Sequence, residues 1–310
     1  MALSYCGMKV DVQGRELVNH GTALFPVACY HDDLRKAAVP WHWHEELEAV
    51  VVTEGCALVA IGGEKKEVCA GNAFFINSGV LHGAWAAGEA ECRFHSLVFH
   101  PRLIGGIDSV YWQRYLRPLT EDAAFKGLLL TPEIPWHQEA MEAVERAWQS
   151  NAQEPPGYEF MVREALSRLI FLLSSHNSPA SAPPSEKALR DGQRMKQMLQ
   201  FIHQSFDQPL TAGDIAAAAM IGESECLRCF RGYMDATPIQ YLRDYRIQVA
   251  AQMLRATQEK INRVAQKCGF QEMSYFARTF RETLGCTPSQ YRRQRTEPSP
   301  SRESRPGPPT

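Results

Sequence analysis

Residues 264–293 read VAQKCGFQEMSYFARTFRETLGCTPSQYRR, and this stretch decides the fold of the C-terminal half. A short helix with an apolar face is expected before Gly269, because glycine readily supplies the positive φ of a tight turn. Phe276, Phe280 and Leu284 then recur at helical spacing and predict the buried face of a second helix. A short helix, a tight turn and a second helix with a polar outer face predict a helix-turn-helix unit.

The same pattern occurs earlier in this half. Thr211 and Asp214 resemble the capping box that starts a helix, and a short turn at residues 221–222 precedes a second helix over residues 223–233. A long helix over residues 239–255 is expected to connect the two units. The C-terminal half is therefore predicted to be all-α, with two helix-turn-helix units in tandem.

These two units resemble the DNA-binding domain of the AraC/XylS transcriptional regulators, over roughly residues 195–293. The first unit departs from the family pattern, with Met220, Gly222 and Cys226 where Gly, Ser and Leu are usual. The resemblance implies that one helix of each unit enters a major groove of promoter DNA, which accepts one α-helix. By position, the resemblance implies that the DNA-binding residues are Ser224, Leu227 and Arg228 in the first unit and Met273, Ser274, Tyr275 and Arg278 in the second.

The charge distribution favours a polyanion as the partner of the C-terminal half alone. Residues 1–185 hold 14 Lys and Arg against 22 Asp and Glu, whereas residues 186–296 hold 17 against 11. A composition of 45% hydrophobic and 22% charged residues excludes a wholly disordered chain. No apolar run is long enough to span a membrane, no secretory leader is apparent, and nine scattered cysteines do not form a disulfide framework. We therefore expect a cytoplasmic protein with no membrane partner.

Short apolar runs separated by glycine-containing turns characterise residues 20–100. They predict strands at residues 47–53, 57–61, 73–76 and 93–99. Strands and turns at this spacing are typical of a sandwich or a small barrel.

Four potential ligands lie within this β-rich region. The segment PWHWHEELEAVVVTEG, residues 40–55, places His42 and His44 two residues apart and Glu48 four residues further on. Alternate residues of a strand share one face, so these side chains are expected on the same side. His82 follows in GNAFFINSGVLHG, residues 71–83. We call His42, His44, Glu48 and His82 the quartet.

The two segments resemble the first and second motifs of cupin barrels, with Asn77 and Ala86 where Pro and Asn are usual. The resemblance implies a cupin-like barrel over about residues 24–100. Three imidazoles and one carboxylate that converge inside a barrel suit a divalent transition metal, such as Fe, Mn, Ni, Cu or Zn. The candidate metal ligands are His42, His44, Glu48 and His82.

Two kinds of ligand remain open for this barrel. Regulators of the AraC/XylS family commonly carry a cupin-like domain that binds an organic effector, often a sugar, without a metal. Nearby tryptophans offer ring faces to such a sugar. On this interpretation the effector-binding residues are Trp41, His42, Trp43, His44, Glu48, His82 and Trp85. The metal interpretation uses the quartet alone and makes a divalent transition metal the candidate cofactor. The effector interpretation requires no cofactor.

The predicted fold is therefore a two-domain α+β chain, with an N-terminal cupin β-barrel followed by an all-α domain. The barrel domain is expected over residues 1–135. A helical segment over residues 136–173 is expected either to cap the barrel or to form a dimer seam, and both alternatives stay open. The Pro- and Ser-rich residues 174–187 predict a linker, residues 188–294 the DNA-binding domain, and residues 295–310 a disordered tail.

These features together predict a sequence-specific transcription regulator rather than an enzyme. We expect it to bind double-stranded promoter DNA and to respond to a small-molecule effector, with a sugar as one candidate. The family resemblance favours activation and implies contact with RNA polymerase, and we expect a homodimer. The alternatives are a metal sensor and a cupin metalloenzyme fused to a DNA-binding module.

Overall fold

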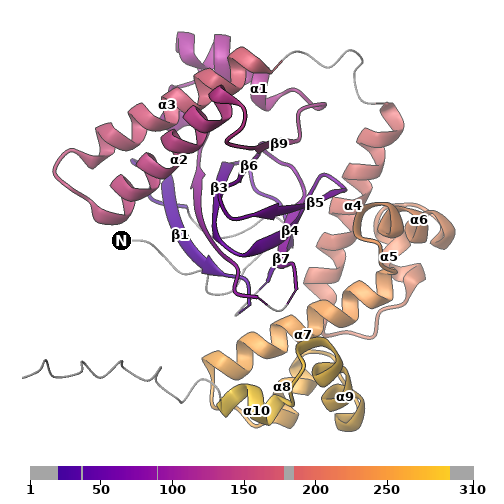
Figure 1. Cartoon of the computed structure of the whole chain (residues 1–310). Coiled ribbons are helices and arrows are strands. Elements are labelled where there is room, and N and C mark those ends of the chain that lie inside the picture. The colour runs from indigo at the N-terminus through magenta and orange to yellow at the C-terminus, as the bar shows by residue number, and fades with distance from the viewer. Residues whose placement is uncertain (1–19, 36–37, 89, 178–184, 294–310) are drawn as a thin grey trace, which may run out of the picture.

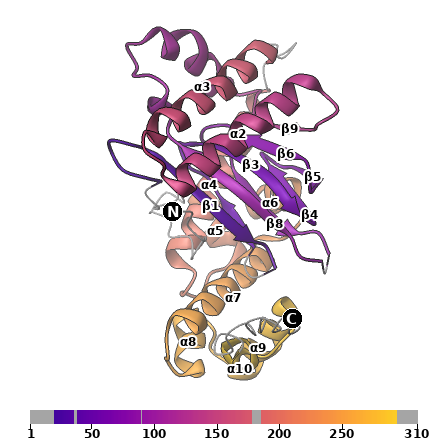
Figure 2. The same ribbon diagram turned by 60° about the vertical axis from the view of Figure 1, so that its left-hand side comes forward.

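The computed structural model describes residues 20–35, 38–88, 90–177 and 185–293. Within these residues, two β-sheets face each other, and helices cover the outer face of each sheet (Figures 1 and 2). Half of the predicted linker, residues 178–184, and the whole predicted tail, residues 295–310, lie outside the described residues. No helix among the described residues combines the length and the apolar character needed to cross a membrane.

The first sheet has five strands in the order β1-β8-β3-β6-β9, and neighbouring strands are antiparallel. Its strands are β1 (Val27–Asp33), β3 (Leu47–Glu54), β6 (Ala73–Ile76), β8 (Arg93–Phe99) and β9 (Gly127–Leu130). The chain between β8 and β9 forms the short helical turns η1 (Pro101–Leu103), η2 (Trp112–Leu116) and α1 (Arg117–Thr120).

The second sheet has four antiparallel strands in the order β2-β7-β4-β5. Its strands are β2 (Val39–His42), β4 (Cys56–Ile61), β5 (Glu64–Cys69) and β7 (His82–Ala86). Cys56 of β4 and Cys69 of β5 are register partners and form a disulfide. The sequence predicted no disulfide framework, and the structure has this single cross-strand bridge among the described residues.

Side chains along β3 alternate between the two faces of the first sheet, so that one face packs inside the barrel and the other packs against the helices. Val50 and Val52 pack between the two sheets, in the cluster that also contains Phe74. Leu47 and Ala49 point the other way and pack in the cluster formed with the helices. Glu48 has the same parity as Val50, so the pleat directs its carboxylate into the barrel.

Two long helices, α2 (Pro135–Gln153) and α3 (Tyr158–His176), pack together over the outer face of the first sheet (Figure 2). Val144, Leu166 and Leu169 are buried with the sheet side chains in one cluster. The apolar sides of both helices are thus buried against the sheet. Of the two alternatives for residues 136–173, the structure of the single chain shows the packing onto the barrel.

Over residues 185–293, the described part of the C-terminal half, the chain forms helices and no strand. They are α4 (Glu186–Ser205), α5 (Ala212–Ala218), α6 (Glu223–Met234), α7 (Pro238–Ala256), α8 (Ile261–Lys267), α9 (Met273–Leu284) and α10 (Pro288–Arg293). The capping boxes Thr211–Asp214 and Thr237–Gln240 begin α5 and α7. The first half of α7 packs with α4–α6 through Leu242, and its second half packs with α8 and α9 through Ile247. The connecting helix therefore belongs to both helix-turn-helix units.

Candidate functional site

The quartet is assembled from strands β2, β3 and β7 and from the turn between β2 and β3. His42 ends β2 and lies opposite His82, the first residue of β7. His44 lies in the turn between β2 and β3, and Glu48 comes from β3 of the other sheet. One donor atom from each of the four residues lies within 4.8 Å of the others. The structure thus brings together all four predicted metal ligands.

Main-chain carbonyl groups fix the orientation of all three imidazoles. Nδ1 of His42 lies 2.9 Å from the Pro40 oxygen, and Nδ1 of His44 lies 3.1 Å from the Glu46 oxygen. Nδ1 of His82 lies 2.7 Å from the Val80 oxygen. Because a carbonyl oxygen only accepts, each Nδ1 donates to its carbonyl, and Nε2 is the ring atom left as the candidate ligand. This arrangement is usual for imidazoles that bind a metal.

The Glu48 carboxylate lies among these imidazoles. Its Oε2 is 3.1 Å from Nε2 of His82 and 3.5 Å from Nε2 of His44. Burial acts to raise the pKa of Glu48, but the two neighbouring imidazoles lower this pKa well below its usual range. Both Nε2 atoms are buried, and neither makes a hydrogen bond within the described part of the chain. Buried polar atoms without hydrogen-bond partners are rare, and this donor set fits a divalent cation.

The space beside the quartet is small. A cavity of about 20 Å³ is lined by His42, His44 and Glu48, together with Tyr30 and Asp32 of β1. This volume suffices for one water molecule or ion, whereas sites for drug-sized ligands measure about 300–1,000 Å³. The arrangement therefore leaves no room for a sugar between the quartet and β1.

The sequence analysis did not single out His20, which also lines this cavity. Its Nδ1 lies 2.8 Å from the Tyr30 hydroxyl, and its ring centroid lies 5.5 Å from that of His44. His20 precedes the first predicted strand and matches no motif. Only the folded arrangement brings it to the quartet.

The structure does not bring the three predicted effector-binding tryptophans to the quartet. Trp41 and Trp43 alternate with the histidines, so the pleat directs them to the outer face of the second sheet. Trp85 lies on the same outer face, with its ring centroid 5.5 Å from that of Trp41. Trp41 and Trp85 line a crevice of about 220 Å³ against α7, outside the barrel.

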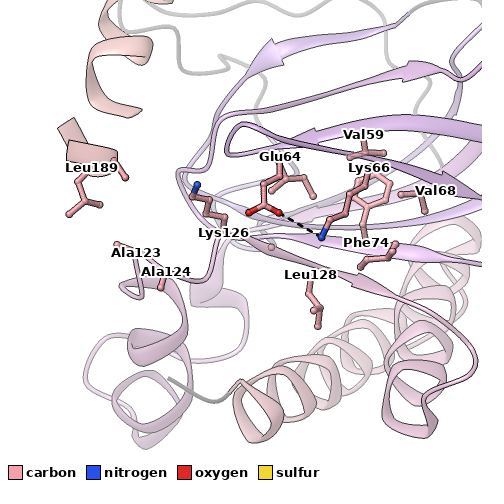
Figure 3. Close-up of a pocket in the computed structure, with 14 residues that line it drawn as sticks. Val59, Glu64, Lys66, Val68, Phe74, Ala123, Ala124, Lys126, Leu128 and Leu189 are labelled. Carbon is pink, nitrogen blue, oxygen red and sulfur yellow. Dashed lines mark ion pairs between the residues drawn. The ribbon is translucent and has the colours of Figure 1, made fainter. Parts of the chain in front are cut away.

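A larger hollow lies at the open edge of the barrel, between β5 and β9 (Figure 3). Its volume is about 330 Å³, and apolar side chains such as Val59, Phe74 and Leu128 line it. The ammonium of Lys66 lies 3.7 Å from a carboxylate oxygen of Glu64, and Figure 3 marks this ion pair with a dashed line. Leu189 of α4 closes one side of the hollow, so this space borders both halves of the chain.

The predicted DNA-binding residues of the second unit lie on the exposed face of α9. Met273, Ser274, Tyr275 and Arg278 are exposed, while Phe276 and Phe280 on the opposite face are fully buried. The Arg278 guanidinium carbon lies 5.6 Å from the centre of the Tyr275 ring. Such a helix can present its polar face to a groove without losing core packing.

The first unit differs because its arginine is held by acidic neighbours. Ser224 and Arg228 are exposed on α6, and Leu227 is half-buried. The Arg228 guanidinium lies 3.1 Å from a carboxylate oxygen of Asp191 on α4 and 3.2 Å from Glu225. Burial acts to raise the pKa of Asp191, but the hydrogen bond from Arg228 lowers this pKa below its ordinary value. A base contact by Arg228 would require these ion pairs to break.

Known proteins resemble both halves of the chain. Residues 24–133 match the family model of the AraC-like ligand binding domain, and residues 215–294 match that of a helix-turn-helix domain. The uncharacterised HTH-type transcriptional regulator YdeC of Bacillus subtilis (strain 168) is 31% identical over 287 residues, which cover 92% of this chain and 97% of YdeC. The HTH-type transcriptional activator RhaR of Mannheimia succiniciproducens is 23% identical over 259 residues, covering 82% and 87% of the two chains. ToxT of Vibrio cholerae, solved with a bound unsaturated fatty acid, is 13% identical over 86% of this chain and 94% of its own, with a TM-score of 0.45.

A ligand-binding β-domain joined to two helix-turn-helix units defines a DNA-binding transcriptional regulator rather than an enzyme. The chain belongs to the AraC family of these regulators. The predictions of family, fold class and DNA binding are thereby confirmed.

Proposed function

We propose that this regulator controls transcription in response to a divalent transition metal ion bound by His42, His44, Glu48 and His82. One observation carries the proposal: four donor atoms lie within 4.8 Å of one another inside the barrel. The carbonyl partners of the three Nδ1 atoms support it, because they leave each Nε2 able to bind a cation. When bound, the ion would supply a positive charge held by His42 and His82 of one sheet and Glu48 of the other, and the donor atoms would govern which metal binds.

The proposal is tested with the full-length chain and a duplex that this chain has selected from a random pool. Affinity is measured after chelation and again after loading with Zn²⁺, Mn²⁺ or Fe²⁺ in turn. We expect one of these ions to change the affinity by about fivefold or more, which is the usual size of coupling between two sites. A His82→Ala variant should keep the metal-free affinity and lose the change.

The exposed His31→Ala variant serves as a matched control, because it removes an imidazole on β1 outside the quartet. It should respond to the metal as the wild type does. Equal wild-type affinity with and without each ion would contradict the proposal.

The hollow at the barrel edge favours a second candidate, an organic effector. Its apolar lining with Lys66 and Lys126 suits a small acid with an apolar body better than a sugar, provided that the acid replaces Glu64 as the partner of Lys66. Thermal-shift measurements with sugars and small carboxylic acids would test this candidate. A carboxylic acid that binds there should raise the unfolding temperature of the wild type more than that of Lys66→Met, whereas equal shifts would place its site elsewhere.

The proposal also includes activation of transcription, contact with RNA polymerase, a homodimer and action in the cytoplasm, where promoter DNA is accessible. Family membership supports these points, and Phe160, Met161 and Phe171 are large apolar side chains of α3 that remain exposed in the single chain. Sedimentation at micromolar concentration tests the dimer, and a purely monomeric profile would contradict it.

A further inference from the structure

The DNA-binding half packs directly on the sheet that supplies two imidazoles of the quartet. Figure 1 shows α4 beside this sheet, on the side away from α2 and α3. One buried cluster contains Trp41, Ala60 and Leu81 of the barrel together with Met195 and Met198 of α4. The two halves are therefore joined by a packed interface as well as by the chain between α3 and α4.

Lys196 of α4 contacts two barrel residues, Gly79 and Trp43, that lie close in the sequence to quartet residues. Its ammonium donates a hydrogen bond to the Gly79 carbonyl oxygen. The same nitrogen lies 4.4 Å from the centre of the Trp43 ring. Burial lowers the pKa of Lys196 below its ordinary value. Both of these partners are neutral, so the contact depends on their placement rather than on a carboxylate.

Both partners of Lys196 belong to loops next to quartet residues: Trp43 lies in the loop that carries His44, and Gly79 lies in the loop before β7, whose first residue is His82. Trp43 directly precedes His44, and Gly79 lies three residues before His82. The Gly79 amide donates to the His44 carbonyl oxygen at 2.7 Å, which ties the two loops together. The Ser78 hydroxyl adds a 2.7 Å hydrogen bond to the Glu45 carbonyl oxygen. Any change in the separation of His44 and His82 therefore moves the groups that Lys196 contacts.

We propose that Lys196 is the positioning residue that transmits occupancy of the quartet to the DNA-binding half. With an ion bound to the quartet, His44 and His82 would hold the two loops at the spacing at which the Gly79 carbonyl and the Trp43 ring receive the Lys196 ammonium. Metal binding thus stabilises the docked arrangement of α4. This inference rests on the proposed function and adds the route by which the ion acts, because coupling requires a contact that differs between two states.

Lys65 offers a matched control at the same interface. It also donates from its ammonium to a carbonyl oxygen across the interface, that of Met234 on α6, at 3.2 Å. Lys65 lies on β5, which contributes no residue to the quartet. Its removal should weaken docking in the metal-free and metal-bound states alike.

The experiment compares the wild type, Lys196→Met, Lys196→Arg and Lys65→Met as full-length chains. Methionine keeps an unbranched apolar side chain and removes the charge, whereas arginine keeps the charge. Two quantities are measured for each: the ratio of duplex affinities with and without the ion, and the affinity for the ion alone in the absence of DNA. The duplex is the one selected from a random pool, and the ion is the one that the wild type binds.

We expect a ratio of about fivefold or more in the wild type and in Lys65→Met. Lys196→Met should bring the ratio below about twofold and weaken ion binding several-fold without DNA, and Lys196→Arg should restore part of both. One ion per chain should remain bound to every variant at saturation.

A ratio in Lys196→Met equal to that of the wild type would overturn the inference while leaving the proposed function intact. Parallel loss of the ratio in Lys65→Met would also overturn it, because the interface as a whole would then carry the coupling. Failure of the wild type to bind any ion would instead remove the proposed function itself.

Discussion

Met220 occupies a backbone conformation that costs an ordinary side chain energy. Its φ is 53°, in the left-handed region, and it closes the turn between α5 and α6. Gly269 closes the corresponding turn between α8 and α9 with a φ of 75°. In both turns the following amide, of Ile221 or of Phe270, bonds back to the carbonyl oxygen of an alanine. The two units therefore share one turn geometry, which only the second unit builds with glycine.

Met220→Gly should stabilise the protein. The left-handed conformation costs an L-residue about 1–2 kcal/mol, and glycine avoids this cost. The greater freedom of glycine in the unfolded chain opposes the gain by about 0.5–1 kcal/mol. Met220 is 88% exposed, so little packing is lost. We expect a net gain of about 0.5–1 kcal/mol in the free energy of unfolding, measured in urea.

The reciprocal variant, Gly269→Ala, is the control for this turn. A Cβ at residue 269 would lie 2.8 Å from the Phe206 carbonyl oxygen, so this variant should lose stability. Unchanged or lower stability in Met220→Gly would show that the turn is not strained.

His203 of α4 makes stability depend on pH. Burial lowers its pKa from 6.5 to about 3, and its Nε2 shares a 2.7 Å hydrogen bond with the Tyr241 hydroxyl. The folded chain keeps this imidazole neutral, whereas the unfolded chain takes up a proton below pH 6.5. The contribution of His203 is therefore complete above pH 6.5 and is lost progressively as the pH falls toward 3.

His203→Gln should remove this dependence, because glutamine does not titrate and can still bond to Tyr241. Each pH unit below the unfolded pKa costs about 1.36 kcal/mol. Between pH 7 and pH 5 the wild type should therefore lose about 2 kcal/mol more than the variant in denaturant titrations. Parallel losses in the two proteins would mean that the buried imidazole takes up a proton without unfolding.

The two helices predicted to enter the major groove, α6 and α9, differ in the partners of their arginine side chains. On α9 the Arg278 side chain is exposed beside Tyr275, whereas on α6 Arg228 is engaged by Asp191 and Glu225. An arginine that reads guanine must present both donors of its guanidinium to the base. Arg278 can do so without first breaking an ion pair to a carboxylate on α4.

Arg278→Ala should therefore weaken binding to a selected duplex by about 1–3 kcal/mol and relax the preference at one base pair. Arg228→Ala should cost less, because the wild type must first break the ion pairs of Arg228. Affinities for selected and random duplexes separate the two roles of an arginine. Equal losses on both duplexes would make Arg278 a phosphate contact rather than a reader of bases.

At the scale of strands, the sequence predicts those strands that are apolar runs ending at a turn. The four predicted strands correspond to β3, β4, β6 and β8 in the structure, because each is an apolar run that ends at a turn. Strand β5 reads EKKEVC and is mostly exposed, so it carries no apolar signal. Its pairing with β4 depends on the register around the turn at Gly62 and Gly63, which also makes the Cys56–Cys69 bridge unpredictable from spacing alone.

The tryptophans show where proximity in sequence misleads. Alternation correctly places His42 on the inner face, and the same alternation places Trp43 on the outer face. Trp41, the immediate neighbour of His42, is also directed outward by this alternation. The quartet follows from spacing within motifs, whereas the surroundings of the tryptophans depend on how the two halves dock.

At the scale of the whole molecule, the two-domain organisation follows from composition and motifs, but the docking of the domains does not. Lys196, Trp43 and Gly79 lie far apart in the sequence, and no periodicity links them. Their contact arises because α4 packs on the outer face of the sheet whose inner face carries His42 and His82. One sheet thus links a candidate metal site to the helices that bind DNA.

The most direct test of the account is the metal content of the full-length protein, purified without chelator, for the wild type beside His42→Ala. Elemental analysis should find about one equivalent of a transition metal per wild-type chain and little in the variant, because a site of four donors loses a ligand. Circular dichroism should confirm that both proteins are folded. A wild-type chain without metal, or equal metal in both proteins, would contradict the account.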